Sequence, residues 1–196
     1  MEVLRGNKVI LRAKRLEDGA NDYAWRCDPE LARLDAAPVL RSSYYEFLLA
    51  YKEELAYPNV RSRRFAIEDQ ATGRQIGNVM IYEIDYERGE AELGIMIGDK
   101  GCWGQGYGTD AIQALLEYAF SHMSLQRIYL ATLNWNVRAQ RSFRKCGFTP
   151  CGSLRRDGYE FLLMELFQHQ WAARRNQLVA AGSQERVPGG RSSAPH

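Results

Sequence analysis

One segment decides the fold of this chain: Ala91-Glu92-Leu93-Gly94-Ile95-Met96-Ile97-Gly98, followed by Cys102-Trp103-Gly104-Gln105-Gly106-Tyr107-Gly108-Thr109-Asp110-Ala111. Its first part reads as a short apolar strand, and its second part is a glycine-dense turn that opens into a predicted helix. Such a turn leaves several backbone N–H groups unpaired and directs them at one point, with the positive end of the helix dipole behind them. The segment therefore predicts a phosphate-binding turn.

Two familiar phosphate-binding patterns do not fit this turn. A Walker loop requires Gly-x-x-x-x-Gly-Lys-Ser/Thr, and no Lys-Ser or Lys-Thr dipeptide occurs here. A dinucleotide fingerprint requires Gly-x-Gly-x-x-Gly near the start of a βαβ unit, whereas these glycines are spaced Gly104-x-Gly106-x-Gly108 after three predicted antiparallel strands. On the pattern alone, a glycine-rich loop without a ligand stays open as an alternative.

Length and composition favour one ordinary globular domain. The chain has 196 residues, 45% of them hydrophobic and 26% charged, and a net charge of +2, which builds no strong field for nucleic acid. No apolar run has membrane-spanning length, and the N-terminus lacks a signal-peptide pattern. We therefore predict a cytoplasmic protein with no nucleic-acid or membrane partner.

The cysteines do not predict a metal site. Cys27, Cys102, Cys146 and Cys151 form no Cys-x-x-Cys pair, and the three histidines do not cluster with them. Cys102 lies beside the glycine turn, but a lone thiol without a neighbouring base is weak evidence for a nucleophile. We predict reduced thiols and no metal.

Periodicity and turn residues predict a mixed α/β (α+β) domain with a mostly antiparallel central sheet, parallel in one region, and about four flanking helices. Strands are expected over residues 8–14, 64–68, 75–86, 91–97 and 127–133, and through 167 after a hairpin turn at 156–159. Helices are expected over 17–27, from the Ser43–Glu46 capping box to Pro58, over 107–122, and from Asn136 to Gly147. The domain should cover residues 1–167, followed by a helix over 168–181 and a polar, disordered tail over 182–196.

Two motifs resemble those of a known family. Trp103-Gly104-Gln105-Gly106-Tyr107-Gly108-Thr109-Asp110-Ala111 resembles the acetyl-CoA signature of the GNAT superfamily of N-acetyltransferases. Asn136-Val137-Arg138-Ala139-Gln140-Arg141-Ser142-Phe143-Arg144-Lys145-Cys146-Gly147-Phe148 is similar to that family's Asn-x-x-Ala/Ser…Lys-x-Gly-Phe helix. The likeness runs from about residue 5 to residue 167. The opening strand and the Asp157-Gly158-Tyr159-Glu160 hairpin resemble the branch that includes ribosomal-protein N-terminal acetyltransferases.

The resemblance implies a GNAT-like sheet, splayed at a bulged strand, and direct transfer of an acetyl group from acetyl-CoA to the primary amine of a protein N-terminus or a small molecule. Acetyl-CoA would be the cosubstrate, with no metal. Ile95, Met96 and Ile97 would hold the pantetheine arm, and Trp103 would open the turn that holds the diphosphate. The N–H groups of that turn belong to Gly104, Gln105, Gly106, Tyr107, Gly108 and Thr109. Asn136 and Phe143 would contact the cosubstrate from the other side. Many members of the family dimerise, so a homodimer is one option.

The resemblance also suggests catalytic residues. Glu92 lies where one branch of the family places its catalytic glutamate and is the first candidate for the base. Glu160 is the second, and Ser142 is a candidate proton relay. Many relatives carry a Tyr as proton donor where this chain has Phe143, so a non-catalytic acyl-CoA-binding or regulatory protein on the same fold is the alternative function.

Overall fold

The computed structural model describes residues 3–184. Its centre is an eight-stranded sheet with the strand order β1-β2-β3-β4-β5-β6-β8-β7. The strands are β1 (Leu4–Arg5), β2 (Val9–Ala13), β3 (Arg63–Asp69), β4 (Gln75–Asp85), β5 (Glu90–Ile97), β6 (Arg127–Leu133), β7 (Thr149–Arg156) and β8 (Tyr159–Phe167). Neighbours pair antiparallel except β5 and β6, which pair parallel. The predicted mixed sheet with one parallel region is therefore confirmed.

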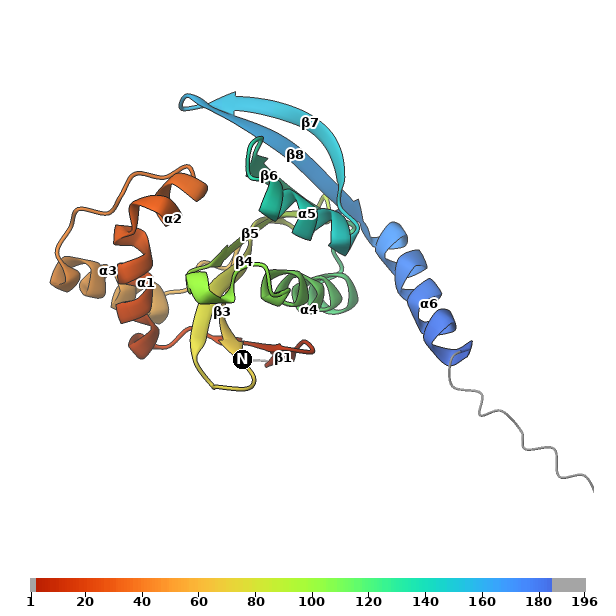
Figure 1. The fold of residues 1–196 in the computed structure, drawn as a ribbon, viewed down its shortest axis with the longest axis horizontal. Coiled ribbons are helices and arrows are strands. Elements are labelled where there is room, and N and C mark those ends of the chain that lie inside the picture. Colours follow the sequence, from red (N-terminus) through yellow and green to blue (C-terminus); the bar gives the residue numbers. More distant parts are fainter. Residues whose placement is uncertain (1–2, 185–196) are drawn as a thin grey trace, which may run out of the picture.

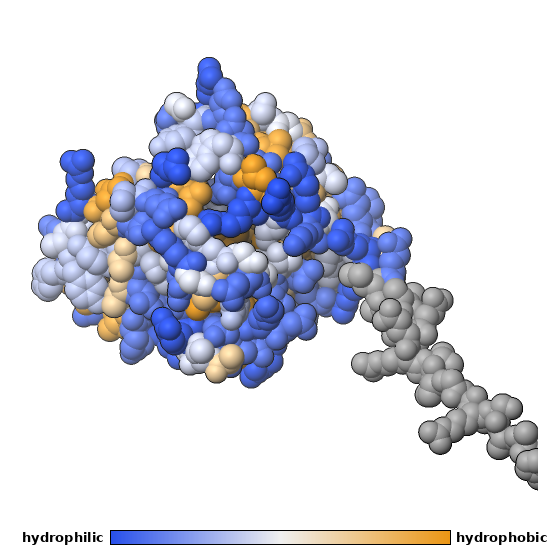
Figure 2. Space-filling view, in the orientation of Figure 1, coloured by the Kyte–Doolittle hydropathy of each residue, from blue (hydrophilic) through white to orange (hydrophobic). Residues whose placement is uncertain are grey.

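The helices form two groups around this sheet. They are α1 (Gly19–Cys27), α2 (Pro29–Leu34), α3 (Tyr44–Ala56), α4 (Tyr107–His122), α5 (Val137–Cys146) and α6 (Gln168–Gln184). Figure 1 shows α1, α2 and α3 gathered at one end of the molecule, opposite α6. The face shown in Figure 2 is mainly hydrophilic, with separate hydrophobic patches between the charged side chains. Within residues 3–184, no helix combines the length and the apolar character needed to cross a membrane.

The two central strands share only a short ladder. Glu90, Ala91 and Glu92 pair with Arg127, Ile128 and Tyr129, and the ladder then ends. Beyond it, β5 continues along β4 as far as Ile97, while β6 continues along β8 as far as Leu133. The strands therefore part at Glu92. The bulge lies on β4 rather than on β5, because between Tyr82 and Asp85 β4 holds one residue more than β5, and Glu83 adopts a left-handed φ of 50° there.

Apolar periodicity and capping residues in the sequence correctly predict the main features of α3, α4 and α5. The stripe Ile112, Leu115, Leu116 and Ala119 is buried on α4, as its periodicity predicts. The Ser43–Glu46 capping box begins α3. On α5, the Asn136 side chain accepts from the Ala139 N–H at 3.2 Å, and Gly147 ends the helix with a φ of 104°.

Two helices differ from the expectation. Pro29 ends α1 as predicted, but it also begins α2, because Asp28 caps the N–H groups of Glu30 and Leu31 and proline suits the first helical position. Helix α6 extends to Gln184, three residues beyond the predicted end, so Gly182 does not end it. The rest of the predicted tail, residues 185–196, lies outside the described residues.

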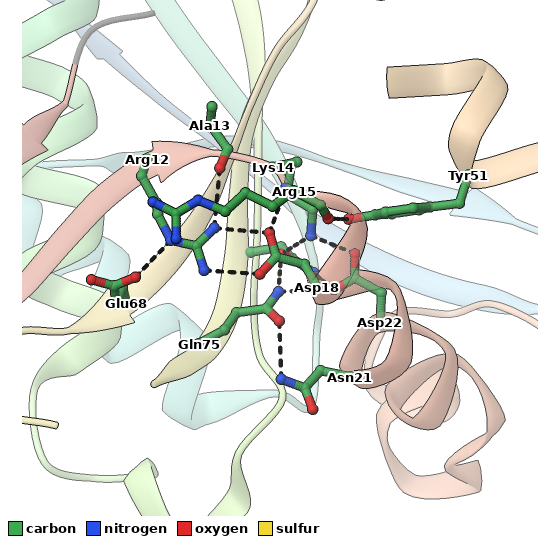
Figure 3. Close-up of polar contacts among 11 residues, drawn as sticks. Arg12, Ala13, Lys14, Arg15, Asp18, Asn21, Asp22, Tyr51, Glu68 and Gln75 are labelled. Atoms are coloured by element: carbon green, nitrogen blue, oxygen red, sulfur yellow. Dashed lines mark hydrogen bonds and ion pairs between the residues drawn. The ribbon is translucent and has the colours of Figure 1, made fainter. Parts of the chain in front are cut away.

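A buried polar network joins the α1 end of the molecule to the sheet (Figure 3). Arg12 of β2 donates to both carboxylate oxygens of Asp18 at 2.8 Å and to Glu68 of β3 at 2.6 Å. Lys14 pairs with Asp22 of α1, and burial lowers the pKa of Lys14 against the opposing attraction of that carboxylate. Burial would raise the pKa of Asp18, but hydrogen bonds from Arg12 and from the Arg15 N–H hold it below its usual value.

The network predicts a large effect of Asp18→Asn on stability. The substitution leaves the buried Arg12 charge without its bidentate partner, which should lower the free energy of unfolding by about 3–5 kcal/mol, measured by urea denaturation. Because folding lowers the pKa of Asp18, its contribution is present above pH of about 4 and is lost as the pH falls through the folded-state value. The difference in the free energy of unfolding between the wild type and Asp18→Asn should therefore become smaller in acid.

The matched control is Glu54→Gln, which removes an ion pair with Arg64 whose side chains are 45% and 51% exposed. Screening by water limits such a pair to about 1 kcal/mol or less. Equal losses in the free energy of unfolding for Asp18→Asn and Glu54→Gln would contradict a structural role for the buried network.

Candidate functional site

The glycine turn presents a row of free N–H groups. Gly104 and Gly106 adopt left-handed φ values of 75° and 87°, which only glycine adopts without strain. Within residues 3–184, the N–H groups of residues 104–109 have no protein hydrogen-bond acceptor, and the first helical bond of this region is that from Asp110 to the Gly106 carbonyl, at 3.0 Å. Six consecutive donors therefore stand at the positive end of α4.

Asp110 holds the turn in place. Its buried carboxylate accepts from the N–H groups of Asn7, Lys8 and Val9 at 2.9, 2.7 and 3.0 Å. The Lys8 ammonium in turn donates to the Gln105 carbonyl at 2.8 Å. These bonds tie the start of α4 to the start of β2, so that the direction of the free N–H groups is set by the sheet.

A cavity of about 430 Å³ runs from this turn along β5. It is lined on the β5 and α4 side by Ile95, Met96, Ile97, Cys102, Trp103, Gly104, Gly106, Tyr107, Gly108, Thr109 and Ile112. The facing residues from α5 and its N-terminal end include Asn136, Val137, Ala139, Ser142 and Phe143. The structure thus brings together nearly all the residues that the sequence suggested for a cosubstrate. Gln105 is not among the lining residues, and its side chain donates instead to the Gly101 carbonyl at 2.5 Å.

Cations from α5 also line this cavity, and they were missed by sequence reasoning. Arg138, Arg141 and Lys145 lie on its wall, and none of them forms an ion pair within the described part of the chain. The Arg138 guanidinium lies 3.6 Å from the centre of the Trp103 ring, and the indole N–H donates to the Ile97 carbonyl at 2.7 Å. Burial lowers the pKa of Arg138. Unpaired positive charge beside free N–H groups suits an anionic ligand.

Ser142 joins the two helices at the cavity wall. Its hydroxyl lies 2.8 Å from the hydroxyl of Thr109, the last residue of the row of free N–H groups. The neighbouring thiols are poorly suited to nucleophilic chemistry, because burial raises the pKa of Cys102 and raises that of Cys146 to about 12.

Glu92 lies at the point where β5 and β6 part. It is the register partner of Tyr82 on β4 and of Tyr129 on β6, so two phenols flank its carboxylate on one face of the sheet. Burial raises the pKa of both phenols, and the Glu92 charge adds to both shifts. Both tyrosines therefore stay protonated at neutral pH. Glu92 itself does not line the cavity.

Glu160 lies apart from the cavity, on the exposed β7–β8 hairpin. Its carboxylate accepts from Arg155 at 2.6 Å and from Asn134 at 2.9 Å. Both oxygens are therefore already engaged.

Helix α2 contributes the remaining part of the site. Leu31, Leu34 and Asp35 line the cavity, although nothing in the sequence analysis singled them out. The pair Asp28-Pro29 carries the signal that could have found this helix, because an Asp cap followed by Pro marks a helix start. No comparable local signal marks the α5 cations.

A second hollow, of about 570 Å³, lies between α1 and the end of β5. Its cations already have partners: Lys100 pairs with Asp28 at 2.7 Å, and Arg74 pairs with Asp99 at 3.5 Å. No residue of the glycine turn lines it in the described part of the chain, so the first cavity is the stronger candidate site. In the described part of the chain, no three His, Cys, Asp or Glu side chains gather as a metal site would require.

Comparison with known proteins gives consistent results. An uncharacterized N-acetyltransferase p20 of Bacillus licheniformis is 28% identical over 156 residues, which cover 79% of this chain and 86% of the relative. The human alpha/beta-tubulin-N-acetyltransferase 9 is 26% identical over 181 residues, covering 86% of each chain. A spermidine N(1)-acetyltransferase of Vibrio cholerae is 36% identical over 92 residues, covering 47% of this chain and 52% of the relative.

The fold has solved counterparts. The crystal structure of spermidine N-acetyltransferase from Vibrio cholerae in complex with CoA and spermine matches with a TM-score of 0.74 at 24% identity, over 84% of this chain and 98% of that one. The acetyltransferase (GNAT) domain profile matches residues 8–149, which include both the glycine turn and α5. The chain therefore belongs to the GNAT acetyltransferase family.

Proposed function

We propose that this protein is an N-acetyltransferase that moves the acetyl group of acetyl-CoA to a primary amine by direct attack in a ternary complex. The proposal is carried by the six N–H groups of residues 104–109, which lack protein acceptors within residues 3–184 and belong to the turn that borders the cavity along β5. The diphosphate would sit on these donors, with Arg138 adding a positive charge that the turn itself does not supply.

The pantetheine arm would lie along Ile95, Met96 and Ile97. Because β5 has left β6 before these residues, its edge facing the gap is free of a strand partner. Backbone groups on that edge can pair with the amides of the arm as a neighbouring strand would, and one N–H can polarise the thioester carbonyl.

The chemistry needs a base but no covalent enzyme intermediate. A free alkylamine has a pKa of about 10.4 and arrives protonated at neutral pH. Once deprotonated, its nitrogen attacks the thioester carbon and the thiolate of CoA departs. Holding the two reactants in contact supplies a large part of the rate enhancement, at best about 7–11 kcal/mol. Glu92, Glu160 and Ser142 remain candidate proton carriers, of which only Ser142 lines the cavity.

The acceptor class is a primary amine, and polyamines are the first to test. Relatives named for spermidine support this choice, as do the carboxylates of Asp35 on the cavity wall and of Glu92 at the fork between β5 and β6, which suit a cationic substrate. A protein N-terminus, as in the ribosomal-protein branch, is the other acceptor to include. The buried Phe143 lacks a hydroxyl, which favours the alternative of a non-catalytic acyl-CoA-binding protein.

Gly106→Ala should weaken CoA binding. The added methyl group meets no neighbour within 4 Å, but a φ of 87° strains any other residue by about 1–2 kcal/mol, which should distort the turn. We expect the Kd for CoA, measured by calorimetry, to rise at least about tenfold. Gly73→Ala is the matched control, since its φ of 69° and open surroundings give similar strain far from the cavity. Similar effects of both substitutions on CoA affinity would contradict the proposed diphosphate site.

Arg138→Gln should also raise the Kd for CoA, by about 10-fold, because a charge-assisted hydrogen bond to the diphosphate is lost. Arg144→Gln removes an exposed arginine of the same helix that does not line the cavity and should leave the Kd unchanged. If the Arg138 variant and the wild type bind CoA with equal affinity, Arg138 does not take part in CoA binding.

Acetyl transfer itself is tested by thiol release. The wild-type protein is incubated with acetyl-CoA and a panel of amines that contains spermidine, spermine and short peptides with free N-termini. We expect thiol release above the buffer rate for at least one acceptor, with the acetylated product seen by mass spectrometry. CoA binding without transfer to any amine would favour the acyl-CoA-binding alternative.

A further inference from the structure

The cavity wall formed by α5 carries a row of cations. Arg138, Arg141 and Lys145 all line the cavity, and they are spaced three and four residues apart, so they lie along one face of the helix. With the helical rise of about 1.5 Å per residue, the step from Arg138 to Lys145 covers about 10 Å. The row is therefore longer than a diphosphate, which cannot contact all three cations at once.

Printed contacts hold the C-terminal half of α5 beside the glycine turn. The Ser142 hydroxyl lies 2.8 Å from that of Thr109, and the Cys146 thiol donates to the Thr109 carbonyl at 3.6 Å. From the other side, Arg174 of α6 donates to the Lys145 carbonyl at 2.9 Å. This half of α5 therefore packs against the first turn of α4, and its cations reach the cavity from there.

The three cations differ in their surroundings. The Arg138 guanidinium stacks on Trp103, 3.6 Å from the ring centre, beside the N–H groups proposed to hold the diphosphate. Arg141 and Lys145 are exposed, and within residues 3–184 neither forms an ion pair. The helix dipole favours a cation at Lys145, but it favours Arg144 equally, and Arg144 does not line the cavity. The dipole therefore does not explain why two further cations line this wall.

The cosubstrate of the proposed function has a second anionic group. Besides its diphosphate, CoA carries a phosphomonoester on the 3′ carbon of its ribose, and such a group has a charge of about −1.5 to −2 at pH 7. The ribose separates it from the diphosphate, so the two anions need separate partners. Two unpaired cations next to the diphosphate site match this group in sign and in number of charges.

We infer that Arg141 and Lys145 bind the 3′-phosphate of CoA and thereby select CoA over its dephosphorylated form. The inference rests on the proposed function and adds a specificity site to it. The row of N–H groups cannot make this selection, because the diphosphate is common to both compounds. A guanidinium can donate two parallel hydrogen bonds to a phosphate, and the lysine ammonium adds a point charge.

Calorimetry with two ligands tests this assignment. CoA and dephospho-CoA, which lacks only the 3′-phosphate, are titrated into the wild type, Arg141→Gln, Lys145→Gln and the double variant. We expect the wild type to bind CoA at least about 10-fold more tightly than dephospho-CoA, because the latter makes no charge-assisted hydrogen bonds to these cations. Each single substitution should lower the ratio of the two Kd values, and the double variant should bring it to about 1.

Arg144→Gln is the matched control, since it removes the same charge from the same helix outside the cavity. It should keep the wild-type ratio of the two Kd values. Equal reductions of this ratio in Arg144→Gln and Arg141→Gln would show that only the total charge of α5 matters, and this result overturns the assignment.

The second ligand also separates this inference from the proposed function. Unchanged binding of dephospho-CoA by the double variant shows that the fold and the diphosphate site are intact. Equal affinity of the wild type for both ligands overturns the assignment while the proposed function stands. A wild-type ratio in the double variant, or equal weakening of both ligands by it, does the same. If the wild type binds neither ligand, the proposed function itself fails.

Discussion

The strands β5 and β6 pair over only three residues each before β4 and β8 draw them apart, and the candidate site depends on this separation. A continuous ladder would pair the backbone of residues 95–97 and close the space beside it. The parting leaves one edge of β5 free, directly upstream of the glycine turn. An extended ligand arm and an anion can therefore be bound by one continuous stretch of backbone, with little dependence on side-chain identity.

Side chains from outside this stretch then give the cavity its polarity. Trp103 and Arg138 stack at the turn, and Arg141 and Lys145 extend the positive wall along α5. Asp35 of α2 adds a negative charge to the wall of the same cavity. The ion pairs of Lys100 and the buried network around Arg12 fix the α1–α3 end of the molecule against the sheet, which positions α2 beside the cavity. An anionic cosubstrate and a cationic acceptor would enter such a site with complementary fields.

Much of this arrangement could be predicted from local sequence. Helix α4 has its predicted bounds, 107–122, because the glycine turn and the Ile112–Ala119 stripe mark them independently, and Asn136 and Gly147 mark α5 equally well. Helix α2 was missed because Pro29 serves as both a stop and a start in a six-residue helix. The places of Asp35 and Arg138 on the cavity wall could not be predicted, since they depend on where α2 and α5 lie relative to β5. That placement results from tertiary contacts rather than from a pattern along the chain.

The central claim is that the N–H groups of residues 104–109 bind the diphosphate of CoA. Backbone amide NMR of the ¹⁵N-labelled protein, with hydrogen exchange measured before and after addition of CoA, tests it most directly. The account predicts that these six amide resonances shift and that their exchange slows, while the turns at Gly73 and Gly158 stay unchanged. Unperturbed amides at 104–109 in the presence of saturating CoA would contradict it.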